Sequence, residues 1–175
     1  MAGPVRDQRV AVGGAADAPG SGGAQRPGEE GGWRGFAQEQ LQARHGPVRA
    51  ALLTAVGWAV WHAPLFVILA TFRGFRPAVL PGFFLGMVAG AVVLAFVYNA
   101  AGGGVAAAAC WHVAYNLSSA SAAASGTVAA VSTAVVMLWA VALLVMAWRA
   151  ARRGAPWPLL AGRRRAGSEP LTLVS

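Results

Sequence analysis

The sequence has few charged residues and no lysine at all. Charged residues make up 11% of its 175 positions and hydrophobic residues 57%, whereas about a quarter of the residues in a soluble domain are charged. An ordinary soluble domain is therefore excluded, and a membrane protein is indicated. All 14 basic residues are arginine. Because they gather at the ends of apolar runs, we expect contact with membrane lipid and no binding of nucleic acid.

Two other absences further narrow the class of protein. The single cysteine, Cys110, excludes an internal disulfide framework. The first 27 residues are rich in Gly, Ala and Pro and lack the apolar stretch of a secretory signal. We predict that residues 1–27 are a disordered leader, because they have too little apolar surface to form a core.

Long uncharged runs dominate the rest of the chain. No Asp, Glu, Lys or Arg occurs from Ala50 to before Arg73, or from Pro77 to Trp148. A transmembrane helix needs about 20 apolar residues, so the second run is long enough for three helices. Small residues at 101–104 and around 118–126 divide it. We predict an all-α polytopic membrane protein with about four transmembrane helices.

These four helices are expected at 47–72, 79–100, 104–122 and 127–148. An amphipathic helix is expected before them, from about Pro27 to His45, because Gly46 and Pro47 end it. Its two sides differ, with Phe36 on the apolar side and Gln38 and Gln42 on the polar side. This helix should lie at the membrane surface or line a wet cavity.

The amphipathic helix opens with Glu29, Glu30 and Arg34. Residues four apart share a helical face, so Glu30 is the natural partner of Arg34. Glu29 is left free for chemistry. The competing interpretation is a solvated, charged first turn, where Glu also suits the helix dipole.

A histidine, His62, lies inside the first long apolar run. An ionisable side chain at membrane depth indicates a functional site. The alternative is a neutral histidine bonded to a nearby carbonyl, packed on Trp58 one turn earlier. Pro64 should break the helix just after His62.

A third polar pair, His112 and Asn116, lies within the predicted third span. Residues four apart lie on one helical face, so both could donate hydrogen bonds to a single developing oxyanion. The alternative is a polar pair that joins two helices.

The three motifs together resemble the CPBP, or Abi, family of intramembrane proteases. That family includes the type II CAAX prenyl endopeptidases and bacteriocin self-immunity proteins. Its pattern is EExxxR, then an aromatic residue and His four apart, then His and Asn four apart. The matching residues here are Glu29, Glu30 and Arg34, then Trp58 and His62, then His112 and Asn116. The resemblance implies a protease-like helical domain over residues 28–148.

The resemblance implies hydrolysis of peptide bonds in membrane-associated proteins or peptides. Glu29 and His62 would activate a water molecule, and His112 and Asn116 would stabilise the oxyanion. Glu30, Arg34 and Trp58 would support them. No cofactor is required by this mechanism. A divalent metal such as zinc, held by Glu29, His62 and His112, stays open as an alternative, although the sequence has no HExxH motif.

Members of that family usually carry several membrane helices before the glutamate motif. We therefore expect this domain to lack N-terminal spans and to be shielded by another copy or a membrane partner. A truncated, non-catalytic immunity or scaffold protein is the alternative to an enzyme, and a transporter with a proton relay is a weaker third interpretation. Residues 149–175 form a basic tail with six arginines, so we expect a bacterial plasma-membrane protein with both termini in the cytoplasm.

Overall fold

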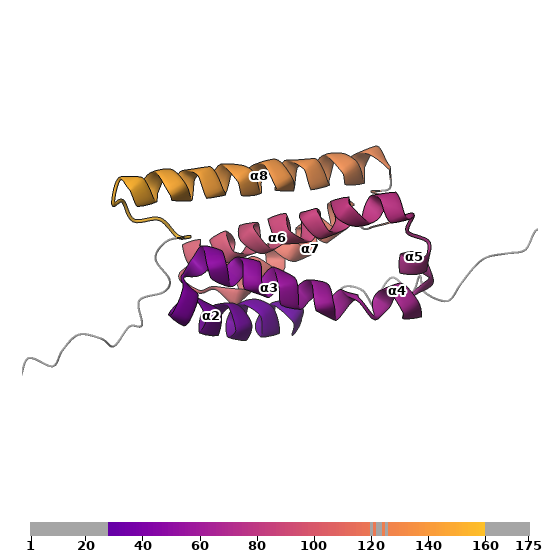
Figure 1. The fold of residues 1–175 in the computed structure, drawn as a ribbon, viewed down its shortest axis with the longest axis horizontal. Coiled ribbons are helices and arrows are strands. Elements are labelled where there is room, and N and C mark those ends of the chain that lie inside the picture. The colour runs from indigo at the N-terminus through magenta and orange to yellow at the C-terminus, as the bar shows by residue number, and fades with distance from the viewer. Residues whose placement is uncertain (1–27, 120, 122–123, 125, 160–175) are drawn as a thin grey trace, which may run out of the picture.

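The computed structural model describes residues 28–119, 121, 124 and 126–159, and every regular element in these ranges is a helix (Figure 1). The elements are η1 (Gly31–Gln38, π-helical), α2 (Glu39–His45), α3 (Pro47–His62), α4 (Leu65–Ile68), α5 (Ala70–Arg73), η2 (Pro77–Val79, 3₁₀), α6 (Leu80–Ala100), α7 (Val105–Ser119) and α8 (Thr127–Arg152). The all-α prediction is confirmed. The predicted disordered leader and the end of the basic tail lie outside the described residues.

The central helix of the bundle is α6. It packs against α3 on one side and α8 on the other, while α7 packs on both α6 and α8. Consecutive residues Val92, Val93, Leu94 and Ala95 are all at most 1% exposed, so the middle of α6 is covered around its whole circumference. A helix that is apolar all round suits the middle of a bundle.

Three helical stretches are long and apolar enough to cross a membrane: Pro47–Ile68, Pro77–Ala100 and Thr127–Arg152. They confirm three of the four predicted spans. The predicted span 104–122 is not among them, because the described helix α7 has 15 residues and a span needs about 20. The hydroxyls of Ser118 and Ser119 both donate to the carbonyl of Tyr115. Local bonds of this kind compete with the helical hydrogen-bond pattern.

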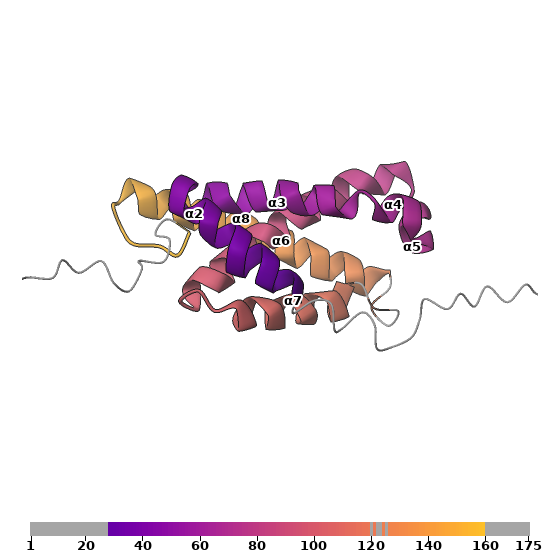
Figure 2. The ribbon, with the colours of Figure 1, turned by 90° about the horizontal axis from the view of Figure 1, so that it is seen from below.

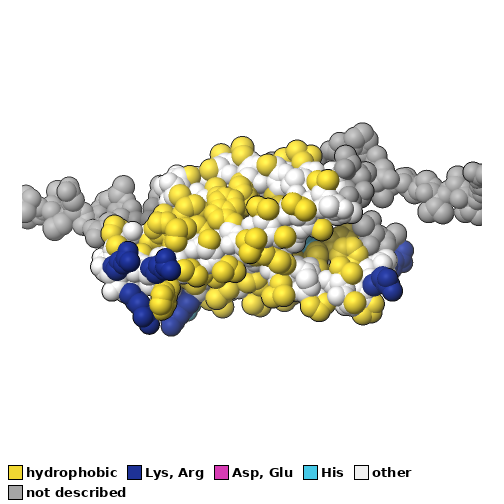
Figure 3. Space-filling model, turned by 90° about the horizontal axis from the view of Figure 1, so that it is seen from above, with side chains coloured by type: hydrophobic (Ala, Val, Ile, Leu, Met, Phe, Trp, Pro, Cys, Tyr) yellow, Lys and Arg dark blue, Asp and Glu magenta, His cyan; other side chains and the backbone are white. Residues whose placement is uncertain are grey.

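On the face shown in Figure 3, hydrophobic side chains cover much of the bundle between two ends that carry arginine. On α8, Val131, Leu138 and Val141 are each more than half exposed. Exposed apolar surface of this extent is unusual in a soluble monomer. It suits contact with lipid, in agreement with the hydropathy of the three long helices.

The helix that carries the glutamates lies under α3, and its first turn lies near the middle of the bundle's length (Figure 2). Its polar side faces the bundle, and its apolar side faces outward. Residues Glu30, Arg34, Gln38 and Gln42, four apart, are all buried, whereas Phe36 is 68% exposed. In an apolar solvent the polar face turns inward, because a polar group costs free energy in contact with lipid.

The π-helical geometry of η1 explains how this buried stripe stays in line. An α-helix has 3.6 residues per turn, so a repeat of four residues drifts around it. A π-helix closes its hydrogen bonds over five residues and holds more residues in each turn. Combining η1 with α2 therefore keeps a four-residue repeat on one face. Gly46, with a φ of 74°, then ends α2, as predicted.

Candidate active site

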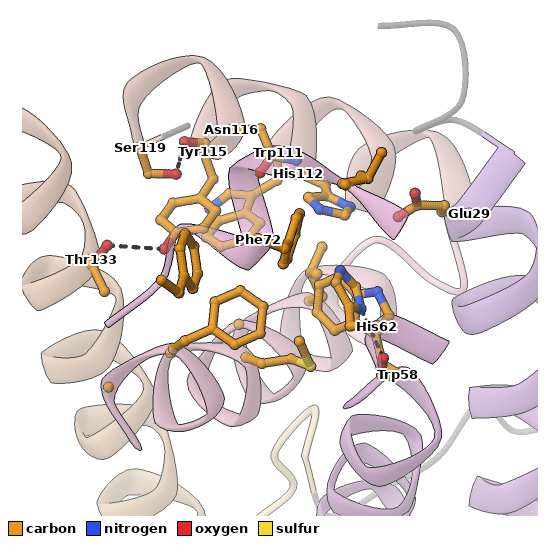
Figure 4. A pocket seen from close by; sticks show the side chains of 18 residues that line it. Glu29, Trp58, His62, Phe72, Trp111, His112, Tyr115, Asn116, Ser119 and Thr133 are labelled. Atoms are coloured by element: carbon orange, nitrogen blue, oxygen red, sulfur yellow. Dashed lines mark hydrogen bonds between the residues drawn. The ribbon is translucent and has the colours of Figure 1, made fainter. Parts of the chain in front are cut away.

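A cavity of about 620 Å³ lies between α3, α6 and α7. The four residues predicted to be catalytic, Glu29, His62, His112 and Asn116, all contribute to its lining, as does Trp58. They come from the start of the glutamate helix, from the end of α3 and from α7. In Figure 4, Glu29, His62 and His112 gather at one end of the cavity. The fold thus brings together three motifs that are up to 87 residues apart in the numbering, from Glu29 to Asn116.

The second glutamate is placed differently from the first. Glu30 is fully buried, and its Oε1 accepts from Arg34 Nη1 at 3.1 Å and lies 2.7 Å from His112 Nδ1. The predicted Glu30–Arg34 pair is therefore present. The contact with His112 was not predicted. We call Glu30, Arg34 and His112 the charged cluster.

The charged cluster is only partly satisfied. Among the described residues, Glu30 Oε2, Arg34 Nε and Arg34 Nη2 are buried without a hydrogen-bond partner. The guanidinium of Arg34 lies over the Trp58 ring, with Cζ 5.1 Å from the ring centroid. Burial lowers the pKa of Arg34 to about 10, and the negative charges of Glu30 and Glu29 oppose that shift. Arg34 therefore stays charged at neutral pH.

His62 has a fixed orientation at the end of α3. Its Nδ1 lies 2.8 Å from the carbonyl oxygen of Trp58. A carbonyl can only accept, so Nδ1 carries the proton and Nε2 of the neutral ring presents a lone pair. The Trp58 ring packs edge-on against both His62 and His112, at centroid distances of 5.6 and 5.3 Å. The predicted break at Pro64 is present, since α3 ends at His62.

Away from these groups, the cavity lining has an apolar part and a polar part. Phe72, Phe75 and Phe83 contribute an apolar wall, and their rings contact one another at centroid distances of 5.4–5.9 Å. The far end, seen in Figure 4, carries Tyr115 and Thr133, whose hydroxyls lie 3.2 Å apart. The cavity therefore offers an apolar binding wall beside a polar reactive end.

The three residues of the possible metal set are not assembled as ligands in this structure. Within the described part of the chain, no group of three His, Cys, Asp or Glu side chains is placed to hold a metal ion. Glu29, His62 and His112 thus share a cavity without the arrangement of a ligand set.

Sequence reasoning missed a second buried polar group on the same helix. Gln38 donates to Gln42 at 2.8 Å and accepts from Thr54 at 3.1 Å, and Gln42 and Asn99 exchange two hydrogen bonds of 2.8 and 3.1 Å. We call Gln38, Gln42, Thr54 and Asn99 the amide cluster. It joins the glutamate helix to α3 and α6. The signal that could have found it is the four-residue spacing that continues from Glu30 and Arg34.

Comparison with known proteins supports the motif-based resemblance. A family model described as "Rce1-like: Type II CAAX prenyl endopeptidase Rce1-like" matches residues 21–118, which is more than half of the chain and includes all three motifs. The chain is also similar to the CAAX prenyl protease 2 of Methanococcus maripaludis, with 42% identity over 40 residues. That match covers 23% of this chain and 15% of the archaeal protein. No solved structure matches the chain.

Proposed function

The chain belongs to the Rce1-like family of type II CAAX prenyl endopeptidases, and we propose that it is an intramembrane endopeptidase. Its substrates would be membrane-associated proteins or peptides, and the nucleophile would be water. One observation carries this proposal: Glu29 and His62 line the same cavity as His112 and Asn116. A site with a base and hydrogen-bond donors around one cavity meets the requirements of peptide hydrolysis.

Glu29 and His62 have complementary parts in activating the water. The Nε2 lone pair of His62 accepts one water hydrogen and holds the molecule in place. Glu29 takes the other hydrogen as a proton while the water oxygen attacks the peptide carbonyl carbon. A C–O bond forms, and the carbonyl π electrons move to the oxygen. The proton on Glu29 then passes to the amide nitrogen as the C–N bond breaks, so Glu29 returns to its starting state.

The negative charge that develops on the carbonyl oxygen must be stabilised by hydrogen-bond donors. Asn116 lies on the cavity wall one helical turn after His112, and its amide nitrogen supplies an N–H. His112 faces the same cavity. Preorganised donors of this kind stabilise a tetrahedral intermediate because they need no reorganisation during the reaction.

The phenylalanine wall favours an apolar group on the substrate. Phe72, Phe75 and Phe83 stand beside the reactive end, so an aliphatic side chain or an attached lipid would be removed from water or bilayer there. Both a prenylated peptide and an unmodified apolar peptide should therefore be tested.

The enzyme would sit in the membrane with the end of α8 in the cytoplasm. Five arginines lie at or near the end of the bundle where α3 begins and α8 ends: Arg44, Arg49, Arg149, Arg152 and Arg153. The opposite end carries Arg73 and Arg76. The side richer in arginine faces the cytoplasm. A reporter fused after Arg165 should report cytoplasm, and a readout from the opposite side would reject this orientation.

The direct test uses the purified chain in detergent with quenched fluorescent peptides, prenylated and unmodified. Glu29→Gln, His62→Ala and His112→Ala should each lower turnover by roughly 10²–10⁴-fold, the usual effect of losing a general base or an oxyanion donor. Glu39→Gln, a carboxylate on the same helical segment outside the cavity, is the control and should keep full activity. Wild-type activity in Glu29→Gln would reject Glu29 as the base. Loss of activity on chelation, restored by zinc, would reject a mechanism without metal.

A further inference from the structure

The far end of the cavity carries two hydroxyl groups that the hydrolytic scheme does not use. The phenol of Tyr115, on α7, and the hydroxyl of Thr133, on α8, have their oxygens 3.2 Å apart, and both residues line the cavity. We call them the hydroxyl pair. Figure 4 places this pair across the cavity from Glu29 and His62. Both ends share one space of about 620 Å³, a volume typical of ligand sites, so a substrate at the reactive end has room to reach the hydroxyls.

The hydroxyl pair has hydrogen-bonding capacity left over. Each hydroxyl has one O–H donor and two acceptor lone pairs. In the bond between Tyr115 and Thr133 one oxygen donates and the other accepts, in either order. One O–H group and lone pairs on both oxygens remain. Because a polar group without a partner costs free energy in apolar surroundings, a ligand group that both accepts and donates would be favoured here.

Three glycines of α6 keep the space beside the hydroxyl pair open. Gly82, Gly86 and Gly90 are four residues apart, and all three line the cavity. A Cβ at Gly82 or Gly90 would meet no atom within 4 Å beyond its chain neighbours and the backbone of its own helix. A Cβ at Gly86 would lie 3.6 Å from Thr133 Cγ2. The helix therefore presents bare backbone to the cavity, which leaves room for a ligand next to Thr133.

The ring of Tyr115 is held by its aromatic neighbours. Trp111 stacks on it with a centroid distance of 5.5 Å and an interplanar angle of 8°. Trp139 packs edge-on against Trp111 at 5.9 Å. A hydroxyl on a ring that is already fixed loses little freedom when a ligand binds, and such preorganisation favours affinity.

The surroundings of the hydroxyl pair favour a neutral ligand group. Among the described residues that line the cavity, Glu29 is the only Asp, Glu, Lys or Arg, and Figure 4 places it at the other end. Helix α8 carries no such residue from Thr127 to Trp148. A charged group would therefore lie beside Thr133 without a counter-ion, and an unpaired charge in apolar surroundings is costly.

We propose that Tyr115 and Thr133 form a substrate-binding subsite for a neutral carboxamide, such as the side chain of glutamine or asparagine. A carboxamide both donates and accepts, as the hydroxyl pair requires. The substrate then has an apolar group against the phenylalanine wall and an amide at the hydroxyl pair. This proposal rests on the proposed function for its part in selecting substrates, whereas binding of the amide is measured without cleavage.

Binding is measured on the full chain in detergent, by fluorescence anisotropy of short labelled peptides. The peptides consist of leucine and alanine, are blocked at both ends, and carry glutamine, methionine or glutamate at one position that is moved along the peptide. Methionine matches the length of glutamine without its amide, and glutamate replaces the amide with a charge. At the best position the glutamine peptide should bind roughly 2–10-fold more tightly than the methionine peptide, the usual effect of one hydrogen bond. The glutamate peptide should bind more weakly than the glutamine peptide.

Variants of the hydroxyl pair assign this preference to its residues. Tyr115→Phe and Thr133→Val each remove one hydroxyl and keep the shape of the side chain, so each should reduce the preference for glutamine. The double variant should abolish it and bind the methionine peptide as the wild type does. Ser132→Ala is the matched control, because the Ser132 hydroxyl bonds to the carbonyl of Ser118 at 3.0 Å and does not line the cavity. It should keep the preference. If the glutamine peptide is cleaved, the double variant should raise its KM and leave kcat unchanged.

The proposal is overturned if the wild type binds none of the peptides, or binds all three equally at every position. It is also overturned if the double variant keeps the preference for glutamine while losing stability, since the hydroxyl bond would then serve only to join α7 to α8. Cleavage without any preference for glutamine would support the proposed function and reject the subsite. A preference in binding without cleavage would support the subsite and reject the proposed function.

Discussion

Glu30 and Arg34 of the charged cluster and Gln38 and Gln42 of the amide cluster occupy successive turns of one helical segment, and all four are buried. The two clusters differ in how completely their hydrogen bonds are satisfied. In the amide cluster each buried amide or hydroxyl has a partner, and Gln42 and Asn99 satisfy each other reciprocally. In the charged cluster three buried atoms of Glu30 and Arg34 lack a partner among the described residues. The hydrogen bonds of the amide cluster are therefore satisfied, whereas those of the charged cluster are not.

This difference separates a structural role from a chemical one. A satisfied neutral network inside an apolar bundle holds helices in one arrangement at little cost. A buried charge pair with unpaired atoms is expensive, because desolvation can exceed the attraction between the charges. The charged cluster, whose burial costs more free energy, includes His112, which lines the cavity. We therefore propose that the amide cluster fixes the helix and that the charged cluster serves the reaction.

The largest effect on stability is expected from Arg34→Met. This substitution leaves the Glu30 carboxylate buried without its cation, which typically costs about 3–5 kcal/mol. Chemical unfolding in detergent would show the loss. Adding Glu30→Gln to the same protein should recover part of it, since the unpaired charge is then removed. Equal stability of Arg34→Met and the wild type would mean that the two side chains are not paired in the folded protein.

A smaller effect is expected from Gln42→Leu. It leaves the amides of Gln38 and Asn99 with unpaired groups, at a cost of about 1–3 kcal/mol. Asn99→Leu alone should behave similarly, and the double variant should be more stable than the sum of the two losses predicts. Activity per folded molecule should stay within a few-fold of wild type. A loss of activity as large as that of Glu29→Gln would show that the amide cluster takes part in the chemistry.

Much of the architecture could be predicted from the sequence, because its signals are local. Uncharged runs identified the three long helices, and Gly46 and Pro64 gave two helix ends where the structure has them. The four-residue spacing predicted the Glu30–Arg34 pair. Three short motifs in order were enough to place four polar residues around one cavity.

The remaining features depend on contacts between distant segments. The π-helical form of η1 and the inward turn of its polar face follow from packing under α3, which no local pattern reveals. The partnership of Gln42 with Asn99 joins residues 57 apart. The contact of Glu30 with His112 joins residues 82 apart.

The most direct test of the account measures turnover and unfolding on the same preparations of two variants, Glu29→Gln and Gln42→Leu. We predict that Glu29→Gln keeps its stability and loses roughly 10²–10⁴-fold in turnover. Gln42→Leu should lose stability by about 1–3 kcal/mol and keep its turnover per folded molecule. The opposite pattern, with turnover intact in Glu29→Gln and abolished in folded Gln42→Leu, would contradict the assignment of chemistry to the cavity end of this helix.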